Sequence, residues 1–515
     1  MPRPMGWPKS YHMSEKYFQH RYLAHKYWGR RPWYAMRALI EAHTAPGETV
    51  LDSFCGSGTT LVEALATGRR AIGVDLNPMA AFICRVTITP ADTDALRQAF
   101  EHLRAAVADE INALYAGDGE GIRPAHWYPT TELPVSAFGI MAKDAGMTVA
   151  DLFTPRNLTA AALLWHGIQT IPCDPVTRDL LRFSFTAAVA QFTKMIRTKK
   201  NGTGWWVNAY RIPRTYRENN VWRSFENKLW AVVRMKEETN ALLGPVSLSM
   251  GDPPEPNAAC RLRIGSATDL SFLPEESVDY VFIDPPWAIK YFDLSVLWCS
   301  WMGFELPFDQ EIFPWQQRFR RDMTQALAEL ARVLRPGKVL TLNFATRYAS
   351  VLNEWREAIE ATGLEWLGVT PLQQDQLSFV QRQHETTLKG NYLLTLRKHG
   401  SPGARATPAE ATPVTEHEIA AMIRALLEER GAMTYDQLFQ ALYPALARRP
   451  LACDLYTVLA TRFGYSITEG RPYEEGVWHL GEGNADPPEA SNHRVAPRMR
   501  GPRREAQLTL PFNGG

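Results

Sequence analysis

In the first part of the chain, short apolar runs alternate with segments whose apolar positions recur at helical spacing. Residues 48–54 and 71–75 are short apolar runs that predict buried strands, and residues 59–67 repeat apolar positions at helical spacing. Strand, helix and strand in this order are typical of one unit of a parallel sheet. We therefore predict such a unit over residues 26–89.

A second unit of the same kind lies beyond the middle of the chain. Short apolar runs predict strands at residues 280–283, 338–344 and 392–396. We expect the two units to complete one sheet, separated by a long segment in which helical periodicity dominates. The predicted fold class is α/β, with a Rossmann-like, mostly parallel sheet, helices on both faces and a large helical insertion.

The last part of the chain has a different pattern. Residues 401–415 are rich in Pro, Ala and Thr, as in a linker, and Thr415 with Glu418 matches a capping box ahead of apolar positions at helical spacing. Two more helical segments and a hairpin around Gly470 follow, which predicts a small winged-helix-like domain. The predicted parts are 1–94 (first half of the core), 95–255 (insertion), 256–400 (second half), 401–415 (linker), 416–482 (winged-helix-like domain) and 483–515 (disordered tail).

Composition narrows the classes of protein. The formal net charge of the 515 residues is only +1, so a nucleic-acid surface would need local segregation of charge. The six cysteines are scattered without a C-x-x-C pair, which argues against a zinc ribbon or a disulfide framework. The start, MPRPMGWPKSYHM, lacks an apolar signal core, and no run of about 18 apolar residues appears. We expect a cytoplasmic protein with no metal and no membrane contact.

A glycine-rich turn follows the first predicted strand in VLDSFCGSGTT. Gly56 and Gly58 remove side chains where a ligand must touch the backbone, and the helix that begins near Thr59 offers unpaired N–H groups. A dinucleotide fingerprint would place a third glycine at Leu61, so NAD and FAD are disfavoured. The alternative is a tight turn with a purely structural role.

Two carboxylates accompany this turn. Asp52 ends the first strand and suits a positively charged ligand, and Asp75 ends the next strand, where it suits ribose hydroxyls. A cofactor with positive charge and no phosphate is therefore indicated. Asp269, in GSATDL after another short strand, is a candidate acceptor for the adenine of that cofactor.

Asp284, Pro285, Pro286 and Trp287 end an apolar strand of the second unit. They are predicted to lie at the same carboxyl edge of the sheet as the glycine-rich turn, where open α/β sheets place their chemistry. The alternative is a strand-ending turn with a packed tryptophan.

These motifs together resemble the amino-methyltransferase family of DNA methylases, which act on adenine N6 or cytosine N4. The resemblance covers HKYWGRRPW, DSFCGSGTT, GVDLNP, GSATDL, DPPW with YFDLSVLW after it, and LRPGKVLTLNF. It implies S-adenosylmethionine as cofactor and catalysis by Asp284 to Trp287. The residues it implies for the cofactor are Lys26, Tyr27, Trp28, Asp52, Phe54, Gly56, Gly58, Thr59, Asp75 and Asp269.

The chemistry of amine methylation agrees with this assignment. An aromatic amine is a poor nucleophile because its lone pair is delocalised, so acceptors for its N–H bonds would direct that lone pair to the methyl donor. Asp284 and a proline carbonyl are the acceptors, and Trp287 would stack on a flipped base. Relatives that act on cytosine N4 usually have Ser at the position of Asp284, so Asp favours adenine.

Basic and aromatic residues in the insertion are candidates for binding double-stranded DNA. The substrate-binding candidates are Arg197, Lys199, Lys200, Trp205, Trp206 and, after the catalytic motif, Tyr291. The alternative for the insertion is a solvated helix face with packed tryptophans. The order of cofactor motif, insertion and catalytic motif resembles enzymes whose target recognition lies between the two motifs.

Three smaller features have competing interpretations. Pro172–Cys173 matches the nucleophilic dipeptide of cytosine C5 methylases, but an incidental thiol is favoured because DPPW already supplies the catalytic position. Asp293 is interpreted as the N-cap of the helix LSVLWCSWMG. Gln507, Leu508, Leu510 and Phe512 resemble a peptide that binds the bacterial sliding clamp, and six-residue matches also arise by chance.

The sequence favours a site-specific DNA methyltransferase that acts on adenine N6 of a flipped base. A cytosine N4 methyltransferase and an RNA amine methyltransferase are the alternative enzymes. A DNA-binding subunit that kept the fold without catalysis is the alternative of another class.

Overall fold

The computed structural model describes the core of the chain and most of its connections. The described residues are 19–117, 121–134, 146–198, 210, 212–251, 254–286, 290–313, 316–344, 346, 348–373, 390–399, 412–446, 449–467 and 476–481. Trp287, Lys199, Lys200, Trp205, Trp206 and the sliding-clamp candidates Gln507, Leu508, Leu510 and Phe512 therefore lie outside the described residues.

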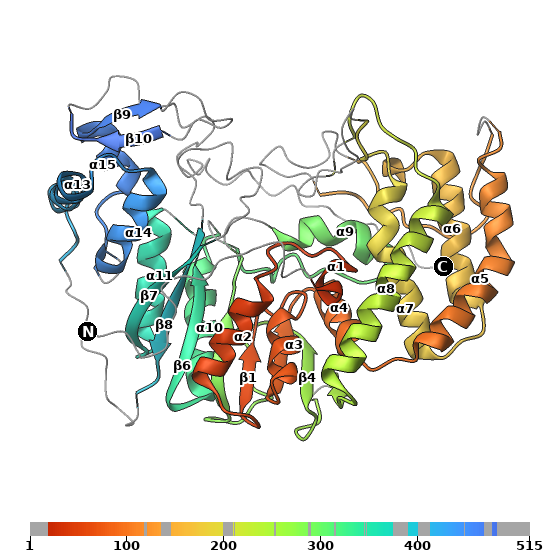
Figure 1. Cartoon of the computed structure of the whole chain (residues 1–515), viewed down its shortest axis with the longest axis horizontal. Helices are drawn as coiled ribbons and strands as arrows, with labels where there is room; N and C mark the ends of the chain where they lie inside the picture. The colour runs from red at the N-terminus through yellow and green to blue at the C-terminus, as the bar shows by residue number, and fades with distance from the viewer. Residues whose placement is uncertain are drawn as a thin grey trace, which may run out of the picture.

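One large sheet forms the centre of the molecule (Figure 1). Its strands are β1 (Thr49–Asp52), β2 (Arg70–Asp75), β3 (Leu248–Ser249), β4 (Cys260–Ile264), β5 (Val278–Ile283), β6 (Leu334–Phe344), β7 (Glu365–Gln373) and β8 (Gly390–Arg397). Their spatial order is β3-β4-β2-β1-β5-β6-β8-β7. All pairs from β3 to β6 are parallel, and β8 runs antiparallel to both β6 and β7. The predicted Rossmann-like, mostly parallel sheet is confirmed.

Side chains of the central strands alternate between the two faces, as the period of a strand requires. Val50, Tyr280 and Phe282 enter an apolar cluster with helices α2 and α3, whereas Leu51 and Val281 enter a different cluster with α10 and α11. Helices thus cover both faces of the sheet. Their bounds are α2 (Trp33–His43), α3 (Thr59–Ala66), α4 (Pro78–Ile88), α10 (Phe319–Val333) and α11 (Ala349–Ala361).

The segment between the two halves of the sheet is helical, and it lies at one end of the molecule in Figure 1. Its elements are α5 (Thr93–Ala113), η2 (Ala150–Leu152), α6 (Pro155–Thr170), α7 (Pro175–Val189), η3 (Ala190–Phe192) and α8 (Val221–Leu243). Asp92 and Asp174 cap α5 and α7 by accepting from backbone N–H groups of the first turn. The apolar faces of these helices share one cluster with α4, with α9 (Tyr291–Met302) and with Tyr27 and Trp28.

The C-terminal elements lie at the opposite end (Figure 1). They are α13 (Glu416–Arg430), α14 (Tyr435–Leu446), α15 (Leu455–Arg462), β9 (Gly464–Ile467) and β10 (Gly476–His479). The first described helix of the chain, α1 (His20–Leu23), is not part of this group. The capping box of Thr415 and Glu418 is present, and β9 and β10 form an antiparallel hairpin, in the element order of a winged helix.

The C-terminal elements share an apolar cluster with the sheet and with α10 and α11. Phe344 stacks on Tyr443 at a centroid distance of 5.6 Å. Val414 is buried and forms a bridge with Leu451, so the last residues of the predicted linker belong to this folded part instead.

Within the described ranges, none of the helices combines the length and apolar composition that crossing a bilayer requires. In those same ranges, His, Cys, Asp and Glu side chains form no group of three or more suited to a metal ion. All six cysteines are free thiols.

Candidate functional site

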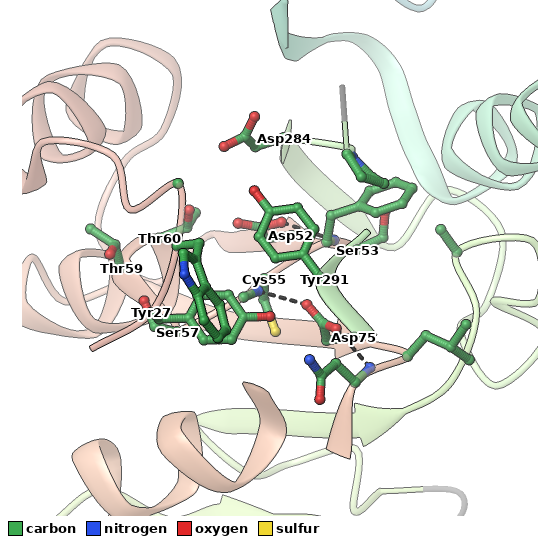
Figure 2. Close-up of a pocket in the computed structure, with 18 of the residues that line it drawn as sticks. Tyr27, Asp52, Ser53, Cys55, Ser57, Thr59, Thr60, Asp75, Asp284 and Tyr291 are labelled. Carbon is green, nitrogen blue, oxygen red and sulfur yellow. Dashed lines mark hydrogen bonds between the residues drawn. The ribbon is translucent and has the colours of Figure 1, made fainter. Parts of the chain in front are cut away.

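A pocket of about 890 Å³ opens at the carboxyl ends of β1, β2 and β5 (Figure 2). The chain leaves β1 towards β2 on one side, while β5 pairs with β1 on the other, so the pocket lies where the strand order reverses. This is the place where open α/β sheets bind ligands. Asp52, Asp75 and Asp284 all line it.

The glycine-rich loop between β1 and α3 has backbone angles that favour glycine. Gly56 has φ +50° and Gly58 has φ +80°. A Cβ atom on Gly58 would lie 2.7 Å from Cys84 Sγ, and one on Gly56 would lie 3.1 Å from Tyr27 Cε1. Gly58 is also the N-cap of α3 and provides no side chain to cap it, so the first N–H groups of this helix remain available near Thr59.

Asp75 anchors the loop from the next strand. One of its carboxylate oxygens accepts from Gly56 N at 2.7 Å, and the other accepts from Asn77 N at 2.8 Å. Burial raises the pKa of Asp75 to about 6, and the two backbone hydrogen bonds act in the opposite direction.

Asp52 is almost completely buried at the end of β1. Burial raises its pKa to about 7, against the opposing effects of hydrogen bonds from Thr60 and the Phe54 N–H. Beside it, Ser53 Oγ is buried and has no hydrogen-bond partner among the described residues. Two buried carboxylates with raised pKa values favour a ligand that brings positive charge.

Two arginines from the segment before α2 also line the pocket, but both already have partners. Arg30 Nε donates to Ser57 Oγ at 2.9 Å, and its terminal nitrogens donate to the carbonyl oxygens of Tyr22 and His25. Arg31 binds Asp284. Among the described lining residues, no lysine is present, so the pocket offers no uncommitted cation for a phosphate.

Asp284 lies directly after β5 and receives three hydrogen bonds. Arg31 Nε donates to Oδ2 at 2.6 Å, and a terminal nitrogen of Arg31 donates to Oδ1 at 2.9 Å. Asn343 on β6 donates to Oδ1 at 2.6 Å. Pro286 lines the pocket, and Pro285 is buried beside it.

Aromatic side chains form the opposite wall. Tyr27 and Tyr291 are stacked, with centroids 6.0 Å apart and an interplanar angle of 16°. Gly29 makes this arrangement possible, because a Cβ atom there would lie 2.6 Å from the Tyr291 hydroxyl oxygen. Figure 2 shows Tyr291 among the three carboxylates of the pocket. Phe54, Thr59 and Trp28 also line the pocket.

The helix that carries Tyr291 begins earlier than the sequence predicts. Its first residue is Tyr291 and its N-cap is Lys290, so Asp293 lies in the first turn and the prediction that it is the N-cap was wrong. Glu311 instead accepts from Phe292 N at 3.1 Å and lines the pocket. Burial raises the pKa of Glu311 to about 7.

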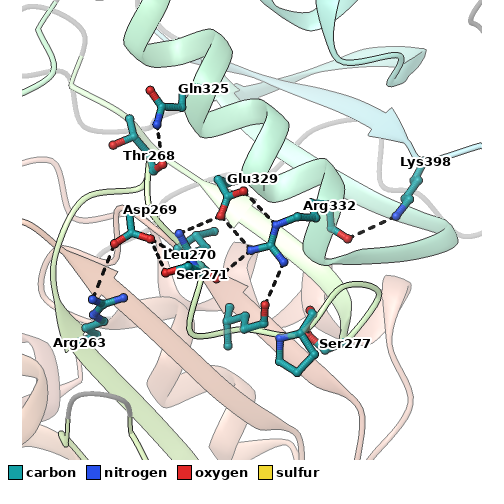
Figure 3. Close-up of polar contacts among 12 residues, drawn as sticks. Arg263, Thr268, Asp269, Leu270, Ser271, Ser277, Gln325, Glu329, Arg332 and Lys398 are labelled. Atoms are coloured by element: carbon teal, nitrogen blue, oxygen red, sulfur yellow. Dashed lines mark hydrogen bonds and ion pairs between the residues drawn. The ribbon is translucent and has the colours of Figure 1, made fainter.

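Asp269 does not line the pocket, which corrects the prediction that it contacts the cofactor. Its Oδ1 accepts from the backbone N of Ser271 at 3.1 Å and from Ser271 Oγ at 2.6 Å, and Arg263 lies 3.8 Å from its other oxygen (Figure 3). This local turn directs the carboxylate back onto its own loop. Ser266 and Ala267 of the same segment line the pocket instead.

Two other predicted residues also lie away from the pocket lining. The Lys26 side chain is exposed, while its neighbour Tyr27 lines the pocket. Arg197 forms an isolated antiparallel bridge with Tyr216 in the insertion, and its role in binding DNA stays a prediction.

Sequence reasoning missed Arg31 and Asn343. Arg31 lies in HKYWGRRPW, a segment that was assigned only to the cofactor. Asn343 is the residue before the last of β6, a strand that was assigned only to the sheet. A polar residue at the carboxyl end of an apolar strand, next to the strand with the catalytic motif, is the signal that would have found Asn343.

Comparisons with known proteins agree with the geometry of the cofactor half. Residues 6–83 match the model of the N6/N4 DNA methylase family. YubD of Escherichia coli (strain K12) is 47% identical over 79 residues, which are 15% of this chain and 28% of that protein. The type II methyltransferase M.MjaII of Methanocaldococcus jannaschii is 30% identical over 80 residues, 16% of this chain and 15% of that protein.

The chain thus spans less than a third of the length of these relatives. Among solved structures, a SAM-dependent methyltransferase from Methanosarcina mazei covers 70% of this chain and 98% of its own, at 10% identity and a TM-score of 0.26. The family match over residues 6–83 contains the glycine-rich loop and β2, and it ends before Asp284.

Proposed function

We propose, starting from the similarity of residues 6–83 to N6/N4 DNA methylases, that this chain is an S-adenosylmethionine-dependent DNA methyltransferase. The observation that supports this most directly is the shared pocket. Asp52 and Asp75, which lie in the matched part of the chain, line the same cavity as Asp284, which lies far outside it.

The pocket fits the proposed cofactor. S-adenosylmethionine has a positive sulfonium and a ribose and lacks phosphate, and the pocket offers buried carboxylates without an uncommitted cation among its described lining residues. Asp52 would face the positively charged methionine part, and Asp75 the ribose hydroxyls. Ser53 Oγ, buried without a partner among the described residues, supplies a further polar contact.

The residues around Asp284 fit an amine as the second substrate. When bound, the cofactor supplies a methyl group whose C–S bond breaks as the new N–C bond forms, with the electron pair staying on sulfur. Asp284 and the Pro285 carbonyl each accept a hydrogen bond from one of the two N–H groups of the substrate amine, so that the nitrogen lone pair is directed at the methyl group. The methylated amine then releases one proton to solvent. Positioning, and no covalent enzyme intermediate, accounts for the reaction.

Adenine N6 of a flipped nucleotide is the proposed target. Asp at position 284, where N4 enzymes of this family usually have Ser, supports adenine over cytosine. The target amine lies inside a duplex, so the nucleotide must leave the base stack to reach the pocket. Tyr291, which lines the pocket, is one aromatic candidate to stack on the base, and Trp287 is a second candidate.

Expression in a methylation-deficient bacterial host tests this proposal. Single-molecule sequencing of the host genome is expected to show N6-methyladenine at a defined motif. N4-methylcytosine would replace the adenine assignment, and methylation found only in RNA would favour the RNA alternative. An unmodified genome and transcriptome, with cofactor bound by the purified protein, would favour a subunit without catalysis.

Cofactor affinity is expected to increase with pH. The pKa values of about 7 for Asp52 and about 6 for Asp75 mean that lowering the pH protonates both groups and removes the charge that attracts a sulfonium. Titration calorimetry from pH 5.5 to 7.5 should show Kd falling about tenfold or more, and then levelling as Asp52 becomes ionised.

The matched variants separate the titrating groups. Asp52→Asn should remove most of the pH dependence of cofactor affinity. The Glu311 carboxyl also lines the pocket and also has a pKa of about 7, but Glu311→Gln should retain the pH dependence. An unchanged pH profile in Asp52→Asn would contradict this assignment.

Asp269→Ala is expected to leave cofactor affinity within about twofold of the original chain. The side chain is directed at Ser271 and Arg263, and it is 57% exposed. The measurement is the Kd for S-adenosylmethionine beside that of Asp75→Ala, which should weaken binding at least tenfold because it also frees two backbone N–H groups. Equal losses in both variants would restore Asp269 to the site.

A further inference from the structure

The hydrogen bonds of Asp284 leave one acceptor position for a substrate. An ionised carboxylate has about four acceptor sites on its two oxygens. Among the described residues, Oδ1 accepts from Arg31 and from Asn343, whereas Oδ2 accepts from Arg31 alone. The unused site is therefore on Oδ2, and one N–H bond of an amine would fill it.

We propose that Arg31 is a positioning residue for methyl transfer, which together with Asn343 orients the Asp284 side chain so that an acceptor site on Oδ2 faces the substrate. The inference rests on the proposed function and adds a residue outside the catalytic motif to it. Both side chains of the ion pair are only 14% exposed, so the two-point contact is held away from bulk solvent. A two-point contact between a guanidinium and a carboxylate fixes orientation as well as charge.

The backbone around Arg31 is itself fixed. Arg30, the preceding residue, is bound to Ser57 of the glycine-rich loop, and Pro32, the next residue, is the N-cap of α2. The segment therefore connects the cofactor loop with Asp284. Asn343 Oδ1 is buried without a partner in the described part of the chain, and the Asn343 amide nitrogen donates to Asp284, so this bond orients the Asn343 side chain.

This arrangement distinguishes the role of Arg31 from that of a cofactor ligand. Two of the donor nitrogens of Arg31 are used on Asp284, and its charge is matched there. Loss of Arg31 should consequently reduce the rate of methyl transfer and leave cofactor binding nearly unchanged. A lysine at this position keeps the charge but has no planar fork, so it restores only part of the function.

The experiment compares Arg31→Ala, Arg31→Lys and the control Arg37→Ala in the full chain, with DNA from a methylation-deficient host as substrate. Arg37 lies on α2, which begins just after Arg31. It is also paired with a carboxylate, that of Glu63, and it does not line the pocket. We expect kcat to fall about 100-fold or more in Arg31→Ala and about tenfold in Arg31→Lys, with Kd for S-adenosylmethionine within about threefold. Arg37→Ala should retain kcat.

Chemical rescue separates positioning from a general effect on folding. Millimolar guanidinium should restore part of kcat in Arg31→Ala but not in Asp284→Ala, and it should leave the kcat of Arg37→Ala unchanged, with sodium chloride at equal ionic strength as the control. An Arg31→Ala variant with unchanged kcat would overturn the inference, and so would a loss of kcat that is matched by loss of cofactor binding or not rescued. Absence of DNA methylation by the original chain would instead contradict the proposed function.

Discussion

Replacing Asp284 with alanine is expected to lower kcat for methyl transfer by about 10²–10³-fold, the cost of removing one positioned hydrogen-bonding group from a transition state. The reason is the loss of the acceptor that directs the amine lone pair, since no other carboxylate in the pocket receives the fork of Arg31. Cofactor binding should survive, because Asp52, Asp75 and the glycine-rich loop are untouched.

Single-turnover methylation and titration calorimetry on the same preparation measure the two quantities. Asp284→Asn is the matched variant, because its amide keeps the size of the side chain but presents a donor to the guanidinium and to the substrate amine. It should be as inactive as Asp284→Ala. Undiminished turnover in either variant would overturn the mechanism.

Gly58→Ala is expected to lower the free energy of unfolding and also to weaken cofactor binding by tenfold or more. A residue with a side chain at φ +80° costs about 1–2 kcal/mol, and the new Cβ atom would meet Cys84 Sγ at 2.7 Å, an overpacking that costs about 1–3 kcal/mol. The loop must then shift, and with it the first N–H groups of α3.

Gly68→Ala is the matched control for this substitution. Its φ is +76°, but the nearest atom to an added Cβ is Pro46 Cβ at 3.8 Å, so it has the backbone strain without the clash and lies outside the pocket lining. Urea denaturation should show a smaller loss of stability for Gly68→Ala, and calorimetry should show unchanged cofactor affinity. Equal behaviour of the two variants would mean that contact with Cys84 is unimportant.

The central strands were predictable because each consists of a short run of consecutive apolar residues, as is typical of buried parallel strands. β1, β2, β5, β6 and β8 appear where the sequence indicates them. β7 was not predicted, since Gly368 and Pro371 interrupt it. The structure explains this tolerance, because β7 is the edge strand of the sheet, where a missing N–H donor is permitted.

Site residues were predictable only where a carboxylate stands at the end of a predicted strand. Asp52 and Asp75 each end a strand, Asp284 directly follows one, and all three line the pocket. Asp269 follows a strand as well, but a local hydrogen bond to Ser271 turns it away, and sequence spacing contains no information on that choice. Arg31 reaches Asp284 across 253 positions of the chain, a contact that only the fold creates.

The apolar cluster that joins the insertion to the core limits how far the insertion can change without affecting the pocket. Tyr27 and Trp28 at the cofactor pocket pack in the same cluster as the helices α5 to α8. The ring centroids of Trp28 and of Trp298 in α9 are 4.6 Å apart. Exchanging the insertion as an independent module would remove one side of the pocket's support. Changes in the insertion are therefore expected to alter the pocket unless they are confined to the exposed surface of the insertion.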